Sequence, residues 1–125
     1  MSFSILLVYH EPQVLGNIVQ YFRQKGFQVT VARELEEAEA LTSKFSYSVV
    51  IARLSQTWMN SDEGLRLIDH IQNRSPSTKV ILLSHDPSPE LRAKALRRGA
   101  QAIIEEPDLL INLDAVAEES VKEIQ

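Results

Sequence analysis

The chain has 125 residues, of which 44% are hydrophobic and 24% charged, as in a soluble globular domain and unlike a disordered chain. It contains no cysteine, which excludes a disulfide framework, a thiol nucleophile and a thiolate zinc site. The net charge of −4 does not favour nucleic acid as a partner. No apolar run is long enough to cross a bilayer and no signal-peptide pattern opens the chain, so we expect a cytoplasmic protein without a membrane partner.

Short apolar runs alternate along the chain with segments of helical periodicity. The runs predict five strands, at residues 5–9, 27–32, 47–52, 80–83 and 102–104. The periodic segments predict five helices, over about 14–26, 34–41, 62–74, 90–98 and about 109–124. Ser61 precedes the third helix and is its expected N-cap, and Gly26 and Gly99 are expected helix stops.

Strands that are apolar at every position are buried on both faces, which is typical of a parallel sheet between two layers of helices. We therefore predict a single α/β domain over residues 1–125, with a doubly wound five-stranded parallel sheet in the order 2-1-3-4-5. Function in such sheets lies at the carboxyl ends of the strands. The residues expected there are Tyr9, His10, Glu11, Arg53, Ser84, His85, Glu105 and Glu106.

Several segments resemble the receiver domain of two-component response regulators. SILLVYHEPQVL resembles its opening strand, and SVVIARLSQTWMNSDEGLRLI resembles its third strand, active-site loop and third helix. KVILLSHD and LRRGAQAIIEEP match its fourth and fifth strands. The resemblance runs along the whole chain and implies a flavodoxin-like, receiver-like (βα)5 fold and a role in two-component signalling and phosphorelay.

The resemblance also shows where the chain departs from the family pattern. In receivers, an acidic pair after the first strand and an aspartate after the third hold magnesium, and that aspartate accepts the phosphoryl group. A hydroxyl residue and a lysine after the last two strands bind the phosphoryl oxygens. Here the acidic pair falls on Tyr9 and His10, the aspartate on Arg53 and the lysine on Glu106, whereas the hydroxyl residue is kept as Ser84.

These substitutions remove the groups that phosphoryl transfer requires. Phosphoryl transfer to the chain needs an oxygen nucleophile, and Arg53 offers only donors. Magnesium needs hard oxygen ligands, of which Glu11 alone remains, and Glu106 puts negative charge where the phosphoryl group needs a cation. We therefore predict a degenerate member, a pseudo-receiver that is not an enzyme, holds no cofactor or metal, and acts as a phosphorylation-independent protein–protein interaction module with another signalling protein.

The exchanged charges suggest an ion pair in the vacated pocket. We predict that Arg53 pairs with Glu106, or with its neighbour Glu105. The alternative is that these side chains extend into solvent.

Other functions compete for the same edge of the sheet. A small-ligand or metal sensor that uses the remodelled pocket is the main alternative, with His10 and His85 as metal ligands, although Arg53 would repel a dication. A hydrolase is disfavoured because Ser84 lies in no Gly-x-Ser-x-Gly elbow. Trp58, in the loop before the third helix, either anchors a partner or covers the pocket.

A basic stripe on the predicted fourth helix lies beside an acidic C-terminal segment. Such a pair of stripes is self-complementary under twofold symmetry, so the fourth helix, fifth strand and last helix form a candidate homodimer face. Solvated helix faces are the alternative. Nucleic acid is disfavoured because no aromatic residues interleave the cations. The residues of this face are Arg92, Lys94, Arg97, Arg98, Ile103, Glu118 and Glu119.

Overall fold

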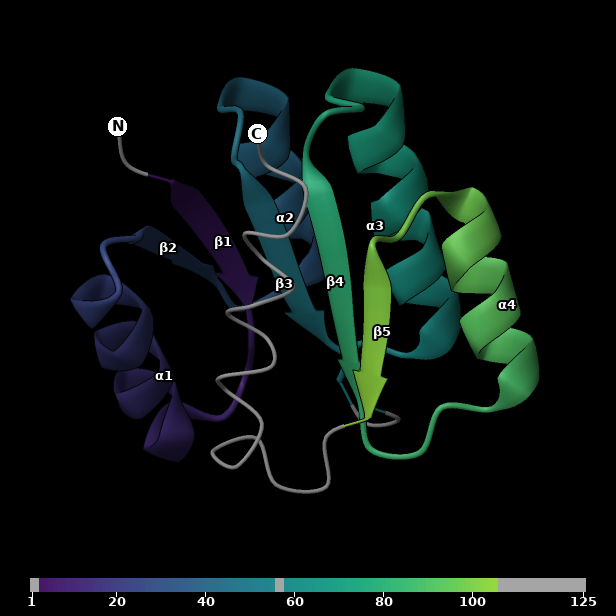
Figure 1. Cartoon of the computed structure of the whole chain (residues 1–125), viewed down its shortest axis with the longest axis horizontal. Coiled ribbons are helices and arrows are strands. Elements are labelled where there is room, and N and C mark those ends of the chain that lie inside the picture. The colour runs from purple at the N-terminus through teal and green to yellow at the C-terminus, as the bar shows by residue number, and fades with distance from the viewer. Residues whose placement is uncertain (1–2, 56–57, 106–125) are drawn as a thin grey trace.

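The computed structural model describes residues 3–55 and 58–105 and has three layers, with a central sheet between helices (Figure 1). The helices alternate with the strands along the chain, as the periodicity predicts. The elements are β1 Ser4–Val8, α1 Pro12–Gln24, β2 Gln28–Ala32, α2 Leu35–Lys44, β3 Val49–Arg53, α3 Ser61–Arg74, β4 Lys79–Ser84, α4 Pro89–Arg98 and β5 Ala102–Glu105.

The five strands form one parallel sheet in the order β2-β1-β3-β4-β5, which confirms the predicted architecture. The bounds differ from the predicted ones by a few residues. The largest difference is in α2, which continues to Lys44, three residues beyond the predicted end. The predicted last helix, at about 109–124, lies outside the described residues. In the described part of the chain, no helix combines the length and apolar character that a bilayer crossing requires.

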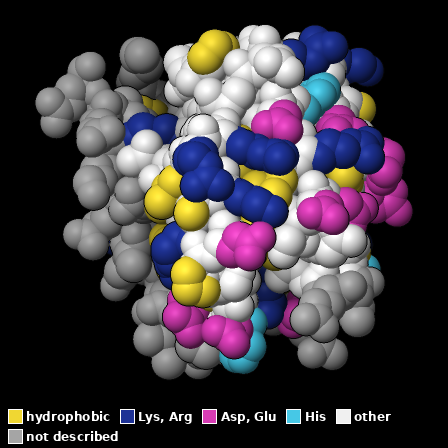
Figure 2. Space-filling model, turned by 90° about the vertical axis from the view of Figure 1, so that its right-hand side faces the viewer, with side chains coloured by type: hydrophobic (Ala, Val, Ile, Leu, Met, Phe, Trp, Pro, Cys, Tyr) yellow, Lys and Arg dark blue, Asp and Glu magenta, His cyan; other side chains and the backbone are white. Residues whose placement is uncertain are grey.

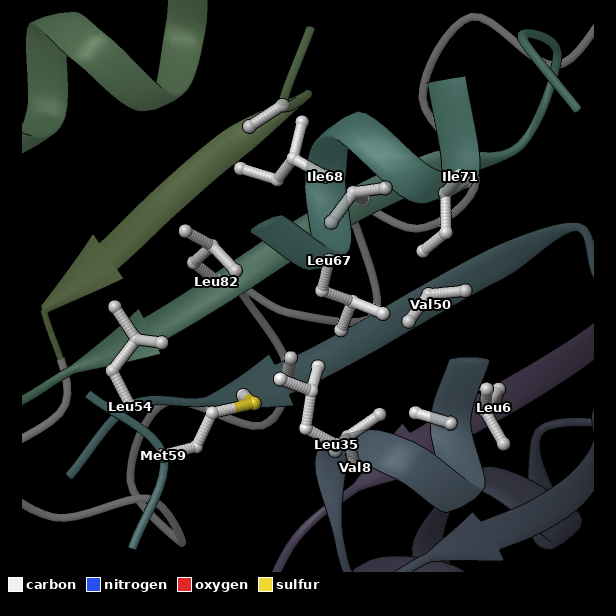
Figure 3. Close-up of a cluster of buried hydrophobic side chains, with 14 of the residues drawn as sticks. Leu6, Val8, Leu35, Val50, Leu54, Met59, Leu67, Ile68, Ile71 and Leu82 are labelled. Carbon is white, nitrogen blue, oxygen red and sulfur yellow. The ribbon is translucent and has the colours of Figure 1, made fainter. Parts of the chain in front are cut away.

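The sheet is buried on both faces because successive side chains of each strand point to opposite layers. In β1, Leu6 and Val8 belong to the cluster beneath α2, α3 and α4, and Ile5 and Leu7 belong to the cluster that packs on α1. Figure 3 shows the first cluster, in which side chains of the strands meet those of α2 and α3. This packing fixes the ends of the strands relative to one another.

The loop between β3 and α3 is anchored in the same cluster. Leu54 and Met59 point from the loop into the core and are 7% and 1% exposed (Figure 3). Gly64 makes room for this arrangement, since a Cβ atom there would lie 2.5 Å from Leu54 Cδ2. The residue that precedes Leu54, Arg53, is therefore held firmly at the end of its strand.

The N-cap of α3 is Asn60, so the prediction of Ser61 as the cap is wrong. Asn60 Oδ1 accepts a hydrogen bond from the backbone N–H of Glu63 at 2.9 Å, and Glu63 Oε1 accepts one from the backbone N–H of Asn60 at 3.0 Å. This reciprocal capping box needs an acid three residues after the cap, and that spacing selects Asn60 over Ser61.

We predict that Asn60→Ala lowers the free energy of unfolding by about 1 kcal/mol, because the backbone N–H of Glu63 loses its acceptor. Ser61→Ala is the matched control and should change it by less than about 0.5 kcal/mol. Urea unfolding of both variants, followed by circular dichroism, measures the difference. A larger loss for Ser61→Ala than for Asn60→Ala would contradict the capping assignment.

Candidate functional site

The candidate site lies at the edge of the sheet where the parallel strands end together (Figure 1). Tyr9, His10 and Glu11 follow β1, and Arg53 and Ser84 are the last residues of β3 and β4. The structure therefore places these five predicted site residues at one edge. His85, directly after β4, and Glu105, the last residue of β5, lie at the same edge, whereas Glu106 lies outside the described residues.

Arg53 is in direct contact with the segment that follows β1. Its Nη1 donates to Tyr9 Oη at 2.9 Å and to Glu11 Oε1 at 3.0 Å. The guanidinium carbon also lies 5.5 Å from the centroid of the Tyr9 ring, in the arrangement of a cation–π contact. The guanidinium of Arg53 is thus held by two residues, by Tyr9 through its hydroxyl and its ring and by Glu11 through its carboxylate.

Both Arg53 and Tyr9 are largely removed from solvent. The Arg53 side chain is 24% exposed and Tyr9 is 1% exposed, whereas the Glu11 side chain is 55% exposed. Arg53 Nε is buried and has no hydrogen-bond partner among the described residues. A guanidinium stays protonated and carries donors only, so the tip of the middle strand presents a cation and no nucleophilic oxygen.

The described partner of Arg53 is Glu11, on the neighbouring strand connection. The predicted pairing with Glu106 stays a prediction, because that residue lies outside the described part of the chain. The alternative partner, Glu105, ends β5 and is not among the contacts of Arg53 there. The strand order favours Glu11, because β1 adjoins β3 while β4 separates β3 from β5. Sequence reasoning placed Glu11 in the pocket but did not use this adjacency.

Trp58 is held on the β2 side of the site. Its Nε1 donates to the backbone carbonyl of Arg33 at 2.8 Å, and its ring stacks on His10 with centroids 5.4 Å apart and planes 19° apart. The indole is half-buried and packs against the core cluster. The sequence left open whether Trp58 covers the pocket, and its described contacts are with His10 and Arg33.

The other side of the site carries both polar and apolar side chains. A cavity of about 470 Å³ lies between the loops that follow β3 and β4, and Ser84 and His85 line it together with Leu54 and Leu91. His85 is exposed. Within residues 3–55 and 58–105, no group of three or more His, Asp or Glu side chains is placed to hold a metal ion.

The predicted basic stripe on α4 is largely paired. Arg92 Nη1 donates to the backbone carbonyl of Ile103 at 2.7 Å, Lys94 pairs with Glu90 at 3.3 Å, and Arg98 pairs with Asp69 at 3.1 Å. Ile103 itself is 4% exposed and belongs to the core cluster, so its side chain adds nothing to an exposed contact face. Glu118 and Glu119 lie outside the described residues.

A second charged contact joins α2 to α3. Arg66 binds Glu39 through two hydrogen bonds, from Nε at 3.0 Å and from Nη2 at 2.8 Å. The hydrogen bond and the charge of Glu39 raise the pKa of Arg66 above its ordinary value, and the charges of Glu36 and Glu63 act in the same direction. Arg66 therefore stays protonated, and the carboxylates near it on α2 and α3 form an acidic surface.

The solved structures that resemble this chain share its whole architecture. A two-component response regulator from Clostridium difficile aligns with a TM-score of 0.82 at 18% identity and covers 99% of both chains. The orphan response regulator HP1043 of H. pylori aligns with a TM-score of 0.79 at 22% identity, over 95% of this chain and 97% of that one. At such identities the likeness establishes the fold.

The sequence comparisons establish the family. The nitrogen assimilation regulatory protein NtrX of Azorhizobium caulinodans is 24% identical over 127 residues, and the Regulator of RpoS of Escherichia coli is 28% identical over 103 residues. The chain spans only 27% and 30% of the lengths of these two curated relatives. The family model of the response regulator receiver domain matches residues 5–115, and the chain belongs to that family.

Proposed function

We propose that this receiver domain is a pseudo-receiver, which takes part in two-component signalling by binding another signalling protein and does so without being phosphorylated. The observation that carries the proposal is Arg53, held at the end of β3 by Tyr9 and Glu11. By the family's pattern, the phospho-accepting carboxylate belongs at this position. Receiver domains are in general signalling modules and not enzymes. Without a phospho-accepting residue, this domain would pass on a signal by binding another protein.

The residues at the site do not fit the magnesium ion that receivers use. Magnesium takes oxygen ligands in octahedral geometry, and the positions of the acidic pair carry a buried phenol and an imidazole. Glu11, the remaining carboxylate of the cluster, is already paired with Arg53 at 3.0 Å. A dication at this place would also lie close to a guanidinium, and the two would repel each other.

The same contacts favour one fixed arrangement of the site. Because Arg53 is three-quarters buried, moving it out of its place would break two hydrogen bonds and a cation–π contact together. A surface that is presented in one arrangement suits constitutive binding of a partner. We propose that this partner is a protein, and that neither nucleic acid nor a membrane is bound.

A ligand sensor is the second candidate, and the cavity beside Ser84 and His85 is the observation that favours it. Its volume of about 470 Å³ falls within the range of small-molecule sites. Its lining combines hydroxyl, amide and imidazole groups with the carboxylate of Asp86 and the side chains of Leu54 and Leu91, so the ligand would be small, with both polar and apolar parts.

We predict that acetyl phosphate or beryllofluoride with magnesium leaves the amide NMR spectrum of the protein unchanged and forms no covalent adduct by intact mass. The reason is that no carboxylate stands where the attack must occur. His10→Asp/Arg53→Asp is the informative variant, since it returns two oxygen ligands to the site, and its spectrum should shift with magnesium. A stoichiometric phosphoryl adduct on the unaltered protein would contradict the proposed function.

We predict that Tyr9→Phe lowers the free energy of unfolding by about 0.5–1.5 kcal/mol, because it removes a buried acceptor of Arg53 and keeps the ring. Glu11→Gln should cost only about 0–1 kcal/mol, since that carboxylate is more than half exposed. Asp86→Asn, at the same edge and without an ion pair among the described residues, is the control. Urea denaturation measures the free energy of unfolding of all three variants. A greater loss of stability for Glu11→Gln than for Tyr9→Phe would argue that the Tyr9 hydroxyl does not hold the Arg53 guanidinium.

A further inference from the structure

A second hollow at the carboxyl edge lies on the side of β2, away from the cavity beside Ser84. We call it the Trp58 groove. It measures about 610 Å³ and lies between the segments that follow β1, β2 and β3. Its lining combines apolar and acidic side chains, chiefly Pro12, Leu35 and Trp58 with Glu34, Glu36 and Glu63.

The charge of the Trp58 groove is negative. Three carboxylates line it against one guanidinium, that of Arg33. Glu63 is occupied in the capping box of α3, whereas Glu34 and Glu36 are exposed and form no ion pair within the described part of the chain. An aromatic ring beside free carboxylates suits an apolar side chain that is accompanied by a cation.

The exposed face of α4 carries the complementary pattern. Leu96 is 47% exposed, one of the two exposed large hydrophobic side chains among the described residues. Arg97 beside it is exposed and has no ion-pair partner among the residues described. The helix holds four cations against one acid, Glu90. Figure 2 shows Lys and Arg side chains gathered near hydrophobic ones on this side of the molecule.

We propose that the Trp58 groove binds α4 of a second copy of this chain, with Leu96 against the apolar lining and Arg97 against Glu34 and Glu36. This inference names one partner for the proposed interaction module and so rests on that function. Arginine suits the site because its planar guanidinium both pairs with carboxylates and stacks on aromatic rings.

The two surfaces lie far apart on one molecule. The Trp58 groove is at the ends of β1, β2 and β3, whereas α4 flanks β5 at the opposite margin of the sheet (Figure 1). A molecule therefore cannot fill its own groove. Because the two surfaces differ, the contact is heterologous, and each copy that joins leaves a free groove at one end and a free α4 at the other.

Sedimentation velocity over a range of concentrations up to millimolar tests the proposal. We expect the mean mass of the unaltered protein to rise past that of a dimer. Arg97→Glu should weaken association by at least about tenfold, the effect of losing one central contact. Arg74→Glu, a charge reversal at the equivalent end of α3, is the matched control and should leave association unchanged.

Mixing two variants distinguishes this heterologous contact from a twofold-symmetric dimer contact. Arg97→Glu keeps an intact groove, and Glu34→Gln/Glu36→Gln keeps an intact α4, so each alone should associate only weakly while their mixture gives a one-to-one dimer. Formation of that dimer also shows that both variants are folded. A protein that stays monomeric at millimolar concentration, or an association that Glu34→Gln/Glu36→Gln leaves intact, overturns the proposal. Neither result touches the phosphodonor test, so failure of this contact is distinct from failure of the proposed function.

Discussion

The contact of Arg53 with Tyr9 and Glu11 organises the carboxyl edge of this sheet. A guanidinium that is three-quarters buried must have acceptors close by, because a buried charge without them is unstable. The phenol and the carboxylate supply those acceptors from the segment after the neighbouring strand, β1. The same cation stands where the family's pattern has the phospho-accepting carboxylate, and it would repel a divalent metal. The proposed function therefore rests on the same contact that organises the edge.

The receiver fold persists around this change because the fold depends on different residues. The sheet is held by apolar side chains that pack on both faces, and the loop after β3 is anchored by Leu54 and Met59 in the core. None of these residues falls on a position that binds magnesium or the phosphoryl group in the family's pattern. A family member can therefore replace its charged site and keep the positions of its strand ends and of its helices.

Much of the fold could be predicted from the sequence, because strands buried on both faces leave an unmistakable run of apolar residues. It was harder to predict which of two neighbouring residues takes a given structural role. Asn60 and Ser61 are both good N-caps, and only the acid at position 63 distinguishes them. The end of α2 was also missed, since its last turn, to Lys44, is polar and shows no apolar periodicity.

At the candidate site, the topology predicted which residues meet at the edge but not which of them touch. Arg53 can reach side chains from either neighbouring strand, and the choice depends on side-chain rotamers, which the pattern of residue types does not reveal. The stack of His10 on Trp58 had no sequence signal, because it joins two residues that are 48 positions apart in the chain. The strand order did contain a usable signal for Glu11, since β1 lies beside β3.

The side-chain Nε–H resonance of Arg53 in a ¹⁵N NMR spectrum tests the central claim most directly. A guanidinium held by Tyr9 and Glu11, with its Nε buried, should give a resolved signal that exchanges slowly with water and does not move when magnesium and acetyl phosphate are added. A fast-exchanging signal like that of a solvated arginine, or one displaced by magnesium, would show that the edge is open to the chemistry that this account excludes.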